Sequence, residues 1–356
     1  MNQHTPSVSV LIPVYNSGDY LRVCIESLEN QDCGTAAEFI CVNDGSTDGS
    51  PAVLDAWAAR DPRVRVIHQR NKGYGKAMNA ALDKARGAYI GIVEPDDWAE
   101  PHMFSTLLRL AEQTGADIAK GVYVGESDKK SHTDTRFQNR AEGETSAPED
   151  FPVFLTGAPS IWAAIYRKSM LEAHRIRFSE TPGASFQDLG FFMRTWAAAE
   201  TIATTGKPVY HYREDNPNSS TRRKEDGAWA VLREIELAKP VFRALAASPV
   251  RRTLLLRRVF HSMLADYKLR VNETLYDWLP ACSELLHALC PQQELHREYF
   301  TNKEWHDLSV LYSHPQDYPE ARKLGASLLQ RIFSIRTEGG RRYVRFLGGR
   351  YDIGSK

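Results

Sequence analysis

The sequence has few features that would place it among secreted, membrane-spanning or nucleic-acid-binding proteins. No apolar run approaches the ~20 residues of a membrane-spanning helix, and the polar start of the chain predicts no signal peptide. The 45 basic and 45 acidic residues cancel, whereas nucleic-acid-binding proteins usually carry a basic excess. The five cysteines are odd in number and form no C-x-x-C pair, which favours buried, reduced thiols. We therefore expect a cytoplasmic protein that binds no nucleic acid.

The first 125 residues of the chain alternate short apolar runs with segments of helical spacing. Strands are predicted at Val8–Val14, Glu38–Asn43, Val64–His68, Gly87–Val93 and Ile118–Val124. Helices are predicted at Asp19–Asn30, Pro51–Arg60, Lys76–Arg86 and Met103–Thr114. This alternation is typical of the α/β fold class, with an open, mostly parallel sheet and helices on both faces.

Polar and acidic residues follow the predicted strands, at the edge where open α/β sheets bind their ligands. Glu94, Asp96 and Asp97 crowd the end of the fourth strand, and such carboxylates repel one another unless a cation relieves them. One interpretation is a divalent cation shared with a substrate diphosphate, and the other is a cap for the helix that follows. Asp44 either contacts a base or ribose or belongs to an ordinary turn.

The loop at residues 71–76 combines two glycines with two lysines and can wrap a diphosphate. It lacks the spacing of a Walker loop. No G-x-G-x-x-G follows the first strand either, which disfavours a dinucleotide-binding Rossmann site.

Four motifs in this order resemble those of the family 2 glycosyltransferases. They are V-S-V-L-I-P-V-Y-N, V-N-D-G-S-T-D, N-K-G-Y-G-K-A-M-N-A-A-L and G-I-V-E-P-D-D-W, and their order and spacing match across residues 8–124. Three segments downstream, Gly157–Arg167, Ile176–Asp188 and Val209–Thr221, look like the acceptor half of members that build bacterial surface polysaccharides. The resemblance implies a Rossmann-like GT-A fold with a donor half (1–125), an acceptor half (126–224) and a helical region with a basic tail (225–356).

The resemblance also implies roles for residues that match the motifs. The implied nucleotide contacts are Pro13, Tyr15, Asn16, Asp44, Asn71, Lys76 and Glu94, and Asp44 faces the uracil edge in relatives that use UDP-sugars. Glu94-Pro95-Asp96 matches the D-x-D metal motif, so Asp96 is implied to bind Mn²⁺ or Mg²⁺, while the longer Glu94 contacts ribose or metal. Asp188 matches the catalytic base, and Gln187 replaces its usual acidic neighbour.

Direct displacement follows from the chemistry of such a donor. The leaving diphosphate needs a cation or a basic side chain. The acceptor hydroxyl needs a carboxylate that takes its proton on the opposite face of the sugar, and one such displacement inverts the anomeric centre. Asp188 is the predicted base, although a residue just before the apolar helix Leu189–Ala198 is also an ordinary helix cap.

Further residues are candidates for contacts with the acceptor or the diphosphate: Asp97, Trp162, Gln187, His211 and Arg213. Trp162 either stacks on a sugar face or lies in the core. His211 is either a second metal ligand or a structural histidine. Arg213 and the loop at Asn216–Thr221 either close over the diphosphate or stay solvated.

The last third of the sequence changes to helical patterns without a strong catalytic motif. Helices are predicted at Gly227–Leu245, Val250–Val271, Leu275–Cys290 and Tyr318–Ile332, and two runs around Glu338-Gly339-Gly340 predict a short β-hairpin tail. The basic second helix and the Arg-rich tail indicate either peripheral contact with the inner face of the plasma membrane or packing on the catalytic domain. A dimer is a further option for this region.

The combined prediction is an inverting glycosyltransferase that moves a sugar from a nucleotide donor of the UDP-sugar class. The acceptor is predicted to be a saccharide or a lipid-linked glycan in cell-surface polysaccharide synthesis. A nucleotidyltransferase is one alternative, but Tyr15-Asn16-Ser17 is not the basic, Gly-rich loop that it would need. An inactive nucleotide- or sugar-binding scaffold is the other, and the retained Asp96 and Asp188 argue against it.

Overall fold

The structure is a computed structural model that describes residues 5–137, 139–217, 219, 227–270, 277–318, 333–338, 341–346 and 349–355. The chain divides into two compact units, residues 1–270 and residues 271–356. Each unit is described by itself below.

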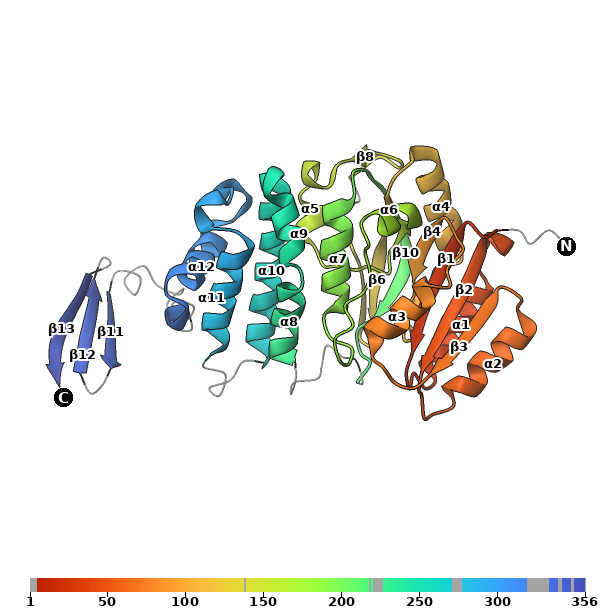
Figure 1. Ribbon diagram of the computed structural model, residues 1–356, viewed down its shortest axis with the longest axis horizontal. Coiled ribbons are helices and arrows are strands. Elements are labelled where there is room, and N and C mark those ends of the chain that lie inside the picture. Colours follow the sequence, from red (N-terminus) through yellow and green to blue (C-terminus); the bar gives the residue numbers. More distant parts are fainter. Residues whose placement is uncertain are drawn as a thin grey trace. The chain divides into compact units, whose positions relative to one another are not determined.

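A mixed sheet of ten strands forms the centre of the first unit (Figure 1). Its strands are β1 (Val8–Val14), β2 (Ala37–Asp44), β3 (Val64–Gln69), β4 (Tyr89–Ile92), β5 (Trp98–Ala99), β6 (Ile118–Ser127), β7 (Lys130–Thr133), β8 (Thr145–Ser146), β9 (Ala164–Arg167) and β10 (Ile202–Arg213). Their order is β3-β2-β1-β4-β9-β6-β10-β5, with β7 paired to β6 and β8 paired to β10. Pairing is parallel from β3 to β4 and between β6 and β10, and antiparallel at β9 and β5. The predicted parallel sheet is therefore confirmed for the first strands, and its mixed character begins at β9.

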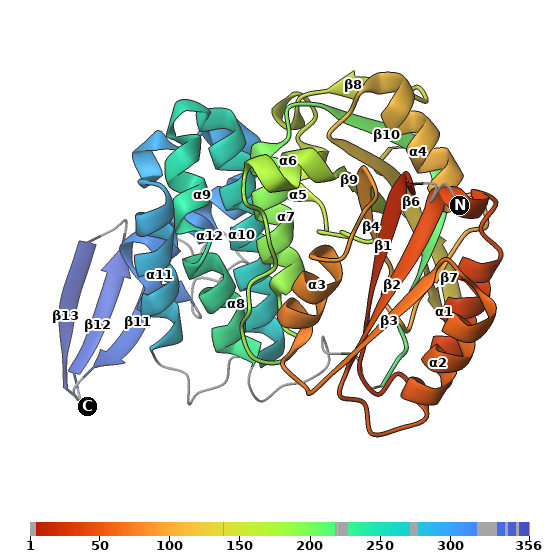
Figure 2. The ribbon, with the colours of Figure 1, turned by 45° about the vertical axis from the view of Figure 1, so that its right-hand side comes forward.

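Helices cover both faces of the parallel part of the sheet (Figure 2). They are α1 (Tyr20–Glu29), α2 (Ser50–Arg60), α3 (Tyr74–Leu82) and α4 (Met103–Thr114). Successive side chains of a strand point to opposite faces. Val8, Val10 and Ile12 of β1 lie in one buried cluster with residues of α1, α2 and α4. Leu11 has the opposite parity and is also fully buried, on the face that α3 covers with its small Ala77.

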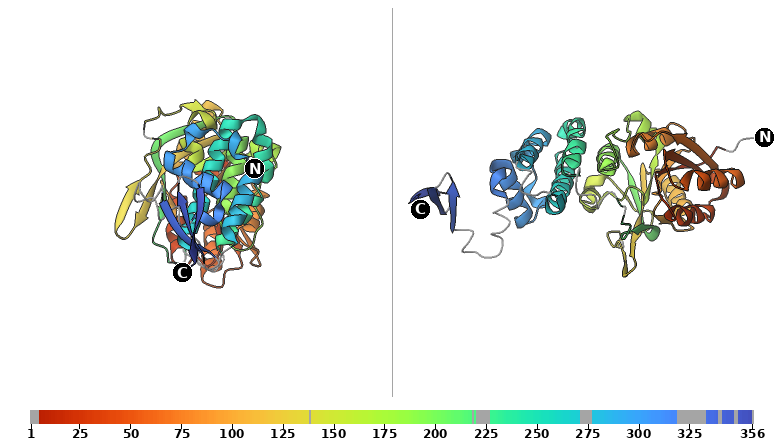
Figure 3. Two further views of the ribbon diagram at one scale, coloured as in Figure 1. Left: turned by 90° about the vertical axis from the view of Figure 1, so that its left-hand side faces the viewer. Right: turned by 90° about the horizontal axis from the view of Figure 1, so that it is seen from below.

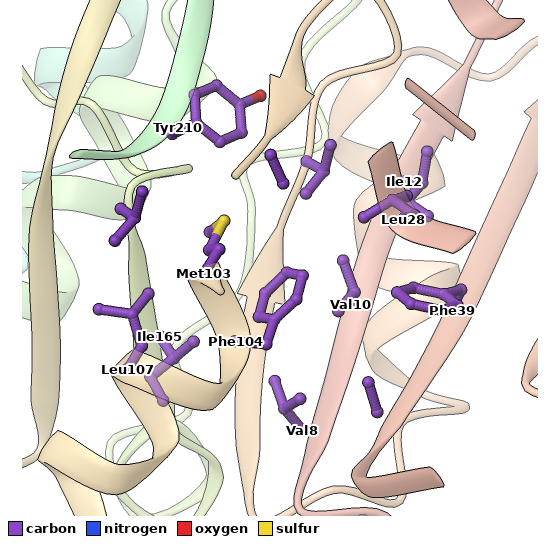
Figure 4. Packing of buried hydrophobic residues seen from close by; sticks show 14 of the residues in the cluster. Val8, Val10, Ile12, Leu28, Phe39, Met103, Phe104, Leu107, Ile165 and Tyr210 are labelled. Atoms are coloured by element: carbon purple, nitrogen blue, oxygen red, sulfur yellow. The ribbon is translucent and has the colours of Figure 1, made fainter. Parts of the chain in front are cut away.

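Phe104 of α4 anchors β4 from within the core (Figure 4). Its ring rests on Gly91 of β4, where an added Cβ would lie 2.7 Å from the ring atom Cε1. Val8 and Val10 of β1 and Ile165 of β9 belong to the same buried cluster. Burying a phenylalanine side chain contributes about 1.5–3 kcal/mol. The packing fixes β4 and, with it, the acidic residues that follow this strand.

Further helices complete the first unit (Figure 3). They are α5 (Val153–Thr156), α6 (Lys168–Ala173), α7 (Gln187–Ala198), α8 (Gly227–Glu236), α9 (Lys239–Ala244) and α10 (Pro249–Arg270). Arg251 ties α10 to the end of α7, because its Nη1 donates to the carbonyls of Ala197 (3.0 Å) and Ala199 (2.9 Å). Its guanidinium also forms an ion pair with Glu149. Helices α8 to α10 thus fall within the first unit, whereas the sequence prediction placed the start of the helical region at 225.

The second unit contains helices and a small antiparallel sheet. Its elements are α11 (Trp278–Leu289), α12 (Asn302–Ser313), β11 (Phe333–Glu338), β12 (Arg341–Phe346) and β13 (Gly349–Ser355). Helix α12 starts at a capping box, in which the Thr301 hydroxyl accepts from the Glu304 N–H (3.2 Å) and the Glu304 carboxylate accepts from the Thr301 N–H (2.7 Å). The three strands pair antiparallel in the order β11-β12-β13.

The strands and helices predicted in the first 125 residues are all present, with ends that differ by a few residues. The helix predicted over Gly227–Leu245 is broken into α8 and α9 just before Pro240, because proline lacks the N–H that continues a helix. The helix predicted at Tyr318–Ile332 lies, after Tyr318, outside the described residues. The hairpin tail contains a third strand, β13, that the sequence did not predict.

No helix in the described part of the chain is both long enough and apolar enough to cross a membrane.

Candidate active site

Asp44 at the end of β2 organises the donor loop, which we define as residues 69–76. Its carboxylate accepts hydrogen bonds from Gln69 Nε2 (2.7 Å) and from the backbone N–H groups of Lys72 (2.9 Å) and Gly73 (2.8 Å). Gly73 has a φ of 92°, a conformation that favours glycine. A carboxylate offers about four acceptor sites. Asp44 therefore shapes the loop and still has acceptor capacity for a ligand.

The other predicted nucleotide contacts differ in exposure. Tyr15, just after β1, has 48% of its surface exposed, and Asn71 and Lys76 of the donor loop are exposed as well. Pro13 is buried inside β1. The Asn16 side chain accepts a hydrogen bond at 2.7 Å from a backbone N–H in the turn after β2. Asn16 is exposed too but joins the turns after β1 and β2, whereas the side chains of Tyr15, Asn71 and Lys76 are placed where they can meet a ligand.

The acid loop, which we define as residues 94–97, follows β4 and is held by two tyrosines. Tyr74 of α3 donates its hydroxyl to Glu94 Oε1 at 2.7 Å. Tyr210 of β10 donates to Asp97 Oδ2 at 2.9 Å and accepts from the Glu94 N–H at 3.0 Å. Asp97 Oδ1 accepts from the backbone N–H of Arg213 at 2.8 Å. Both Asp97 oxygens are used inside the protein, so this residue braces β10 against the acid loop instead of facing a substrate.

Three carboxyl groups, those of Glu94, Asp96 and Asp97, crowd the acid loop. Burial raises the pKa of Glu94 to about 8, with further contributions from the charges of Asp96 and Asp188 and against the hydrogen bond from Tyr74. Burial, together with the charge of Asp96, also raises the pKa of Asp97. Asp96 Oδ2 accepts a neutral hydrogen bond from an amide, the Nδ2 of Asn216, at 2.8 Å. An amide supplies no counter-charge to Asp96. The raised pKa values mean that Glu94 and Asp97 resist ionisation at this site, and a bound cation would favour their charged forms.

This donor set fits a divalent cation that is shared with a substrate. Within the described ranges, no group of three or more His, Cys, Asp or Glu side chains could hold a metal ion by itself. Hard cations such as Mg²⁺ are often bound by one or two carboxylates when phosphate and water supply the other oxygens. Asp96 offers one such carboxylate, and a bound cation would relieve the repulsion within the acid loop.

Asp188 lies in the first turn of α7, where its side chain reaches solvent. Burial by the surrounding protein nevertheless raises its pKa above the ordinary aspartate value, while the backbone N–H of Leu189 and the guanidinium of Arg258 act in the opposite direction. The charge of Asp188 in turn raises the pKa of Tyr74 and of Glu94. The acid loop and the predicted base therefore lie close enough to interact, although they are far apart in sequence.

The base turn, which we define as residues 179–187, connects Asp188 to the donor loop. The Gly183 carbonyl accepts from the Tyr74 N–H at 3.1 Å. The Gln187 side chain stabilises the turn, because its Oε1 accepts from the Ser185 N–H (2.5 Å) and its Nε2 donates to Thr181 Oγ1 (2.9 Å). Gln187 was predicted to contact the acceptor. In the structure, both ends of its amide bond to residues of the base turn.

Helix α3 approaches the base turn so closely that glycine is required. A Cβ on Gly75 would lie 1.9 Å from the carbonyl oxygen of Ser179. Asn79, one turn further along α3, pairs with the backbone of Phe178 through both ends of its amide, each bond being 3.0 Å long. The donor loop, α3 and the base turn thus form one continuous hydrogen-bonded assembly.

Trp162 belongs to an aromatic cluster beside the acid loop. Its ring stacks on Tyr210 at 4.5 Å and on Tyr212 at 5.2 Å, measured between ring centroids. Tyr123 packs edge-on against it at 4.8 Å. Because Trp162 remains partly exposed, it supports Tyr210 and also keeps an accessible edge.

His211 and Arg213 of β10 are engaged by neighbouring side chains. The His211 ring nitrogens lie 2.7 Å from Glu100 Oε1 and 3.1 Å from Glu126 Oε1. Both ring nitrogens of His211 thus pair with Glu100 and Glu126, and neither contacts Asp96 in this arrangement. The Arg213 guanidinium lies over the rings of Tyr20 (4.8 Å) and Trp98 (4.9 Å), and Nε donates to the Asp96 carbonyl at 3.0 Å.

The sequence did not single out several residues that the structure brings to this site. Tyr74 stands within the N-K-G-Y-G-K motif, and a tyrosine between two glycines was the available signal. Asn216 was seen only as part of a loop. Arg258 was grouped with the basic face of a helix, and no local pattern distinguished it from its neighbours.

Comparison with known proteins gives one consistent family. Residues 9–175 match the family model "Glycosyl transferase family 2". The chain is 35% identical over 214 residues to EpsH of Bacillus subtilis (strain 168), covering 59% of this chain and 61% of EpsH, so it spans about three fifths of that relative. It is 30% identical over 272 residues to the glycosyltransferase GlyG of Streptococcus pneumoniae, covering 73% of this chain and 87% of GlyG.

A solved structure has the same fold over nearly the whole chain. Residues 1–349 of S. aureus TarS, crystallised in complex with UDP-GlcNAc, align with a TM-score of 0.78 over 97% of this chain and 98% of that one. The sequence identity is 20%. At this identity the comparison establishes the fold.

Proposed function

The chain belongs to glycosyl transferase family 2, and from this premise we propose that it is a metal-dependent, inverting glycosyltransferase of the GT-A fold that uses a UDP-sugar. The observation that carries the proposal is the placement of Asp188. It is a solvent-accessible carboxylate whose pKa is raised by burial, and it interacts with the acid loop that follows β4. Asp188 would serve in proton transfer and the acid loop in binding the diphosphate, so different carboxylates of one site would carry the two tasks.

The donor half offers the chemistry that a uridine nucleotide needs. The exposed ring of Tyr15 provides a face on which a base can stack. Asp44, which already accepts three hydrogen bonds, can accept another from a ring N–H of the base. The TarS structure of the same fold was solved with UDP-GlcNAc, which supports a UDP-sugar as the donor class.

The diphosphate is assigned to the acid loop and its surroundings. Asp96 and Glu94 would hold Mn²⁺ or Mg²⁺, which supplies positive charge to the leaving diphosphate. Lys76 is exposed at the start of α3 and offers a second cation. The hydrogen bond from Tyr210 to Asp97 would hold the acid loop against β10 while the diphosphate binds.

Asp188 would take the proton from the acceptor hydroxyl. Its carboxylate is ionised above its raised pKa, and the oxygen that it activates attacks the anomeric carbon as the diphosphate leaves. A single displacement of this kind inverts the configuration at that carbon. The acceptor class that the motif resemblance implies is a saccharide or a lipid-linked glycan of cell-surface polysaccharide synthesis.

A thermal-shift screen of nucleotides followed by a donor-hydrolysis assay tests this proposal. We expect UDP to stabilise the protein only when Mn²⁺ or Mg²⁺ is present, and we expect one UDP-sugar to be hydrolysed slowly in the absence of an acceptor. Indifference to every nucleotide would support an inactive scaffold. Stabilisation by a nucleoside triphosphate, with release of pyrophosphate, would support a nucleotidyltransferase.

A further inference from the structure

Among the residues that the structure describes, no carboxylate forms an ion pair with the Arg258 guanidinium of α10. Its Nη2 donates to Ser262 Oγ at 2.9 Å, and its Nε is buried and donates to no acceptor among the described residues. Other arginines of this region are ion-paired, as Arg136 is with Asp134 at 2.8 Å. Buried cations in proteins are normally paired, because removing a charge from water without a partner is costly. The Arg258 Nε, a buried N–H donor without an acceptor among the described residues, therefore needs an explanation.

Arg258 lies close enough to the predicted base for their charges to interact. Helices α7, α8 and α10 lie side by side in Figures 1 and 2. Arg251 of α10 bonds to the last carbonyls of α7. Arg258 follows seven residues later, about two turns along the same face of α10. The first turn of α7 contains Asp188, and the charges of Arg258 and Asp188 act on each other's pKa.

The surroundings of Arg258 include the guanidinium of Arg136. Burial and the neighbouring charge of Arg136 lower the pKa of Arg258 to about 10, although Asp188 opposes this shift. Lys120 of β6 is buried as well, and its Nζ donates to the carbonyl (2.7 Å) and the hydroxyl (2.9 Å) of Ser160. The same Ser160 hydroxyl accepts from Arg136 at 3.2 Å. Asp134 is the carboxylate that pairs with Arg136, while burial lowers the pKa of Lys120 and favours its neutral form.

We propose that Arg258 binds an oxyanion of the acceptor, a carboxylate or a phosphate, next to the hydroxyl that Asp188 deprotonates. The proposal rests on the proposed function and adds the chemical class of the acceptor. A guanidinium presents several N–H donors in a fixed fork that matches a carboxylate or phosphate. An anion bound at the guanidinium would supply a further counter-charge to Arg258 and would align the neighbouring hydroxyl with the base.

The alternative role of Arg258 is to adjust Asp188 alone. In that case the guanidinium would keep the base ionised without touching the acceptor. The two roles make different predictions, since a group that only adjusts the base affects neutral and anionic acceptors equally.

The test measures binding of three sugars to the full chain saturated with UDP and Mn²⁺, so that the diphosphate position is already filled. The probes are methyl glucuronide, glucose 6-phosphate and methyl glucoside, which carry a carboxylate, a phosphate and no charge. Their affinities are measured by titration calorimetry for the wild type and for Arg258→Met. Arg258→Lys keeps the charge without the fork, and Arg243→Met removes an exposed arginine of α9 as a matched control.

We expect the wild type to bind at least one anionic sugar about 10- to 100-fold more tightly than methyl glucoside, the range for a hydrogen bond to a charged group. Arg258→Met should abolish this preference, Arg258→Lys should restore part of it, and Arg243→Met should leave it intact. The anionic sugar that binds more tightly than methyl glucoside shows whether Arg258 recognises a carboxylate or a phosphate.

Equal affinities for all three sugars in the wild type would overturn the proposal, and so would a preference that survives in Arg258→Met. UDP binding and donor hydrolysis are measured on the same samples. If these are normal while the preference is absent, the acceptor inference fails alone. If the wild type neither binds UDP nor hydrolyses a donor, the proposed function fails instead.

Discussion

Replacing Asp188 by asparagine separates its two possible roles, because asparagine keeps the shape and the helix-capping ability but does not accept a proton as a carboxylate does. The side chain reaches solvent and forms no ion pair with any residue that the structure describes, so the fold should tolerate the change. General base catalysis contributes about 10²- to 10⁴-fold. We expect kcat to fall by that factor while the affinity for UDP, measured with Mn²⁺, stays within about twofold of the wild type.

The pH dependence of the wild type gives an independent test of the same assignment. A base acts in its ionised form, so activity rises as pH rises through its pKa. Burial places the pKa of Asp188 above the ordinary aspartate value of about 3.9, and the acidic limb of the kcat profile should therefore lie above that value. Arg258 lowers this pKa, so Arg258→Met should move the limb to higher pH.

Near-normal turnover of Asp188→Asn with intact UDP affinity would refute the reasoning, and the residue would then be a helix cap. A loss of UDP binding in the same variant would also refute it, because a residue on the acceptor side should not be needed for the nucleotide. Asp188→Glu serves as the comparison, since it keeps the carboxylate and displaces it by one methylene.

Three further changes address the neighbouring elements. Asp96→Ala should abolish the metal-dependent part of UDP stabilisation in a thermal-shift assay, and unchanged stabilisation in Mn²⁺ would make Asp96 a structural residue. Tyr74→Phe leaves an oxygen of Glu94 without its hydroxyl donor and should lower the free energy of unfolding in urea by about 1–3 kcal/mol. Gly75→Ala forces a Cβ against the base turn and should cost at least about 1–3 kcal/mol, whereas Gly49→Ala, with no atom within 4 Å of the added Cβ, should cost much less.

The predicted order of strands and helices in the donor half is confirmed because those elements follow from local patterns. The apolar run Val8–Val14 is buried along its whole length, as a strand inside a sheet is. Apolar residues at helical spacing predict the helix Met103–Thr114, and α4 has these bounds. The mixed part of the sheet was harder. Strand β9 pairs antiparallel with both β4 and β6, and no local pattern in its four residues specifies two partners from distant parts of the chain.

The site shows the same division between local and distant information. Motif matching predicted roles for Asp44, Asp96 and Asp188, which lie at the end of β2, after β4 and in the first turn of α7. It also grouped Asp97 and Gln187 with the ligand contacts, yet their polar atoms are used to hold β10 and the base turn. A carboxylate or an amide in a motif has the same sequence signal whether it faces a ligand or the backbone.

The residues that connect the two halves of the site depend on contacts over long stretches of sequence. Tyr74 links the acid loop to the base turn through Glu94 and Gly183, and its neighbours in the motif do not reveal either partner. Arg258 and Asp188 are about 70 residues apart in sequence, yet their charges interact. That Arg258 Nε has no acceptor among the described residues can be recognised only in the folded structure. A sequence pattern can therefore propose candidate reacting groups, whereas contacts such as those of Tyr74 and Arg258 depend on which helices and loops pack together.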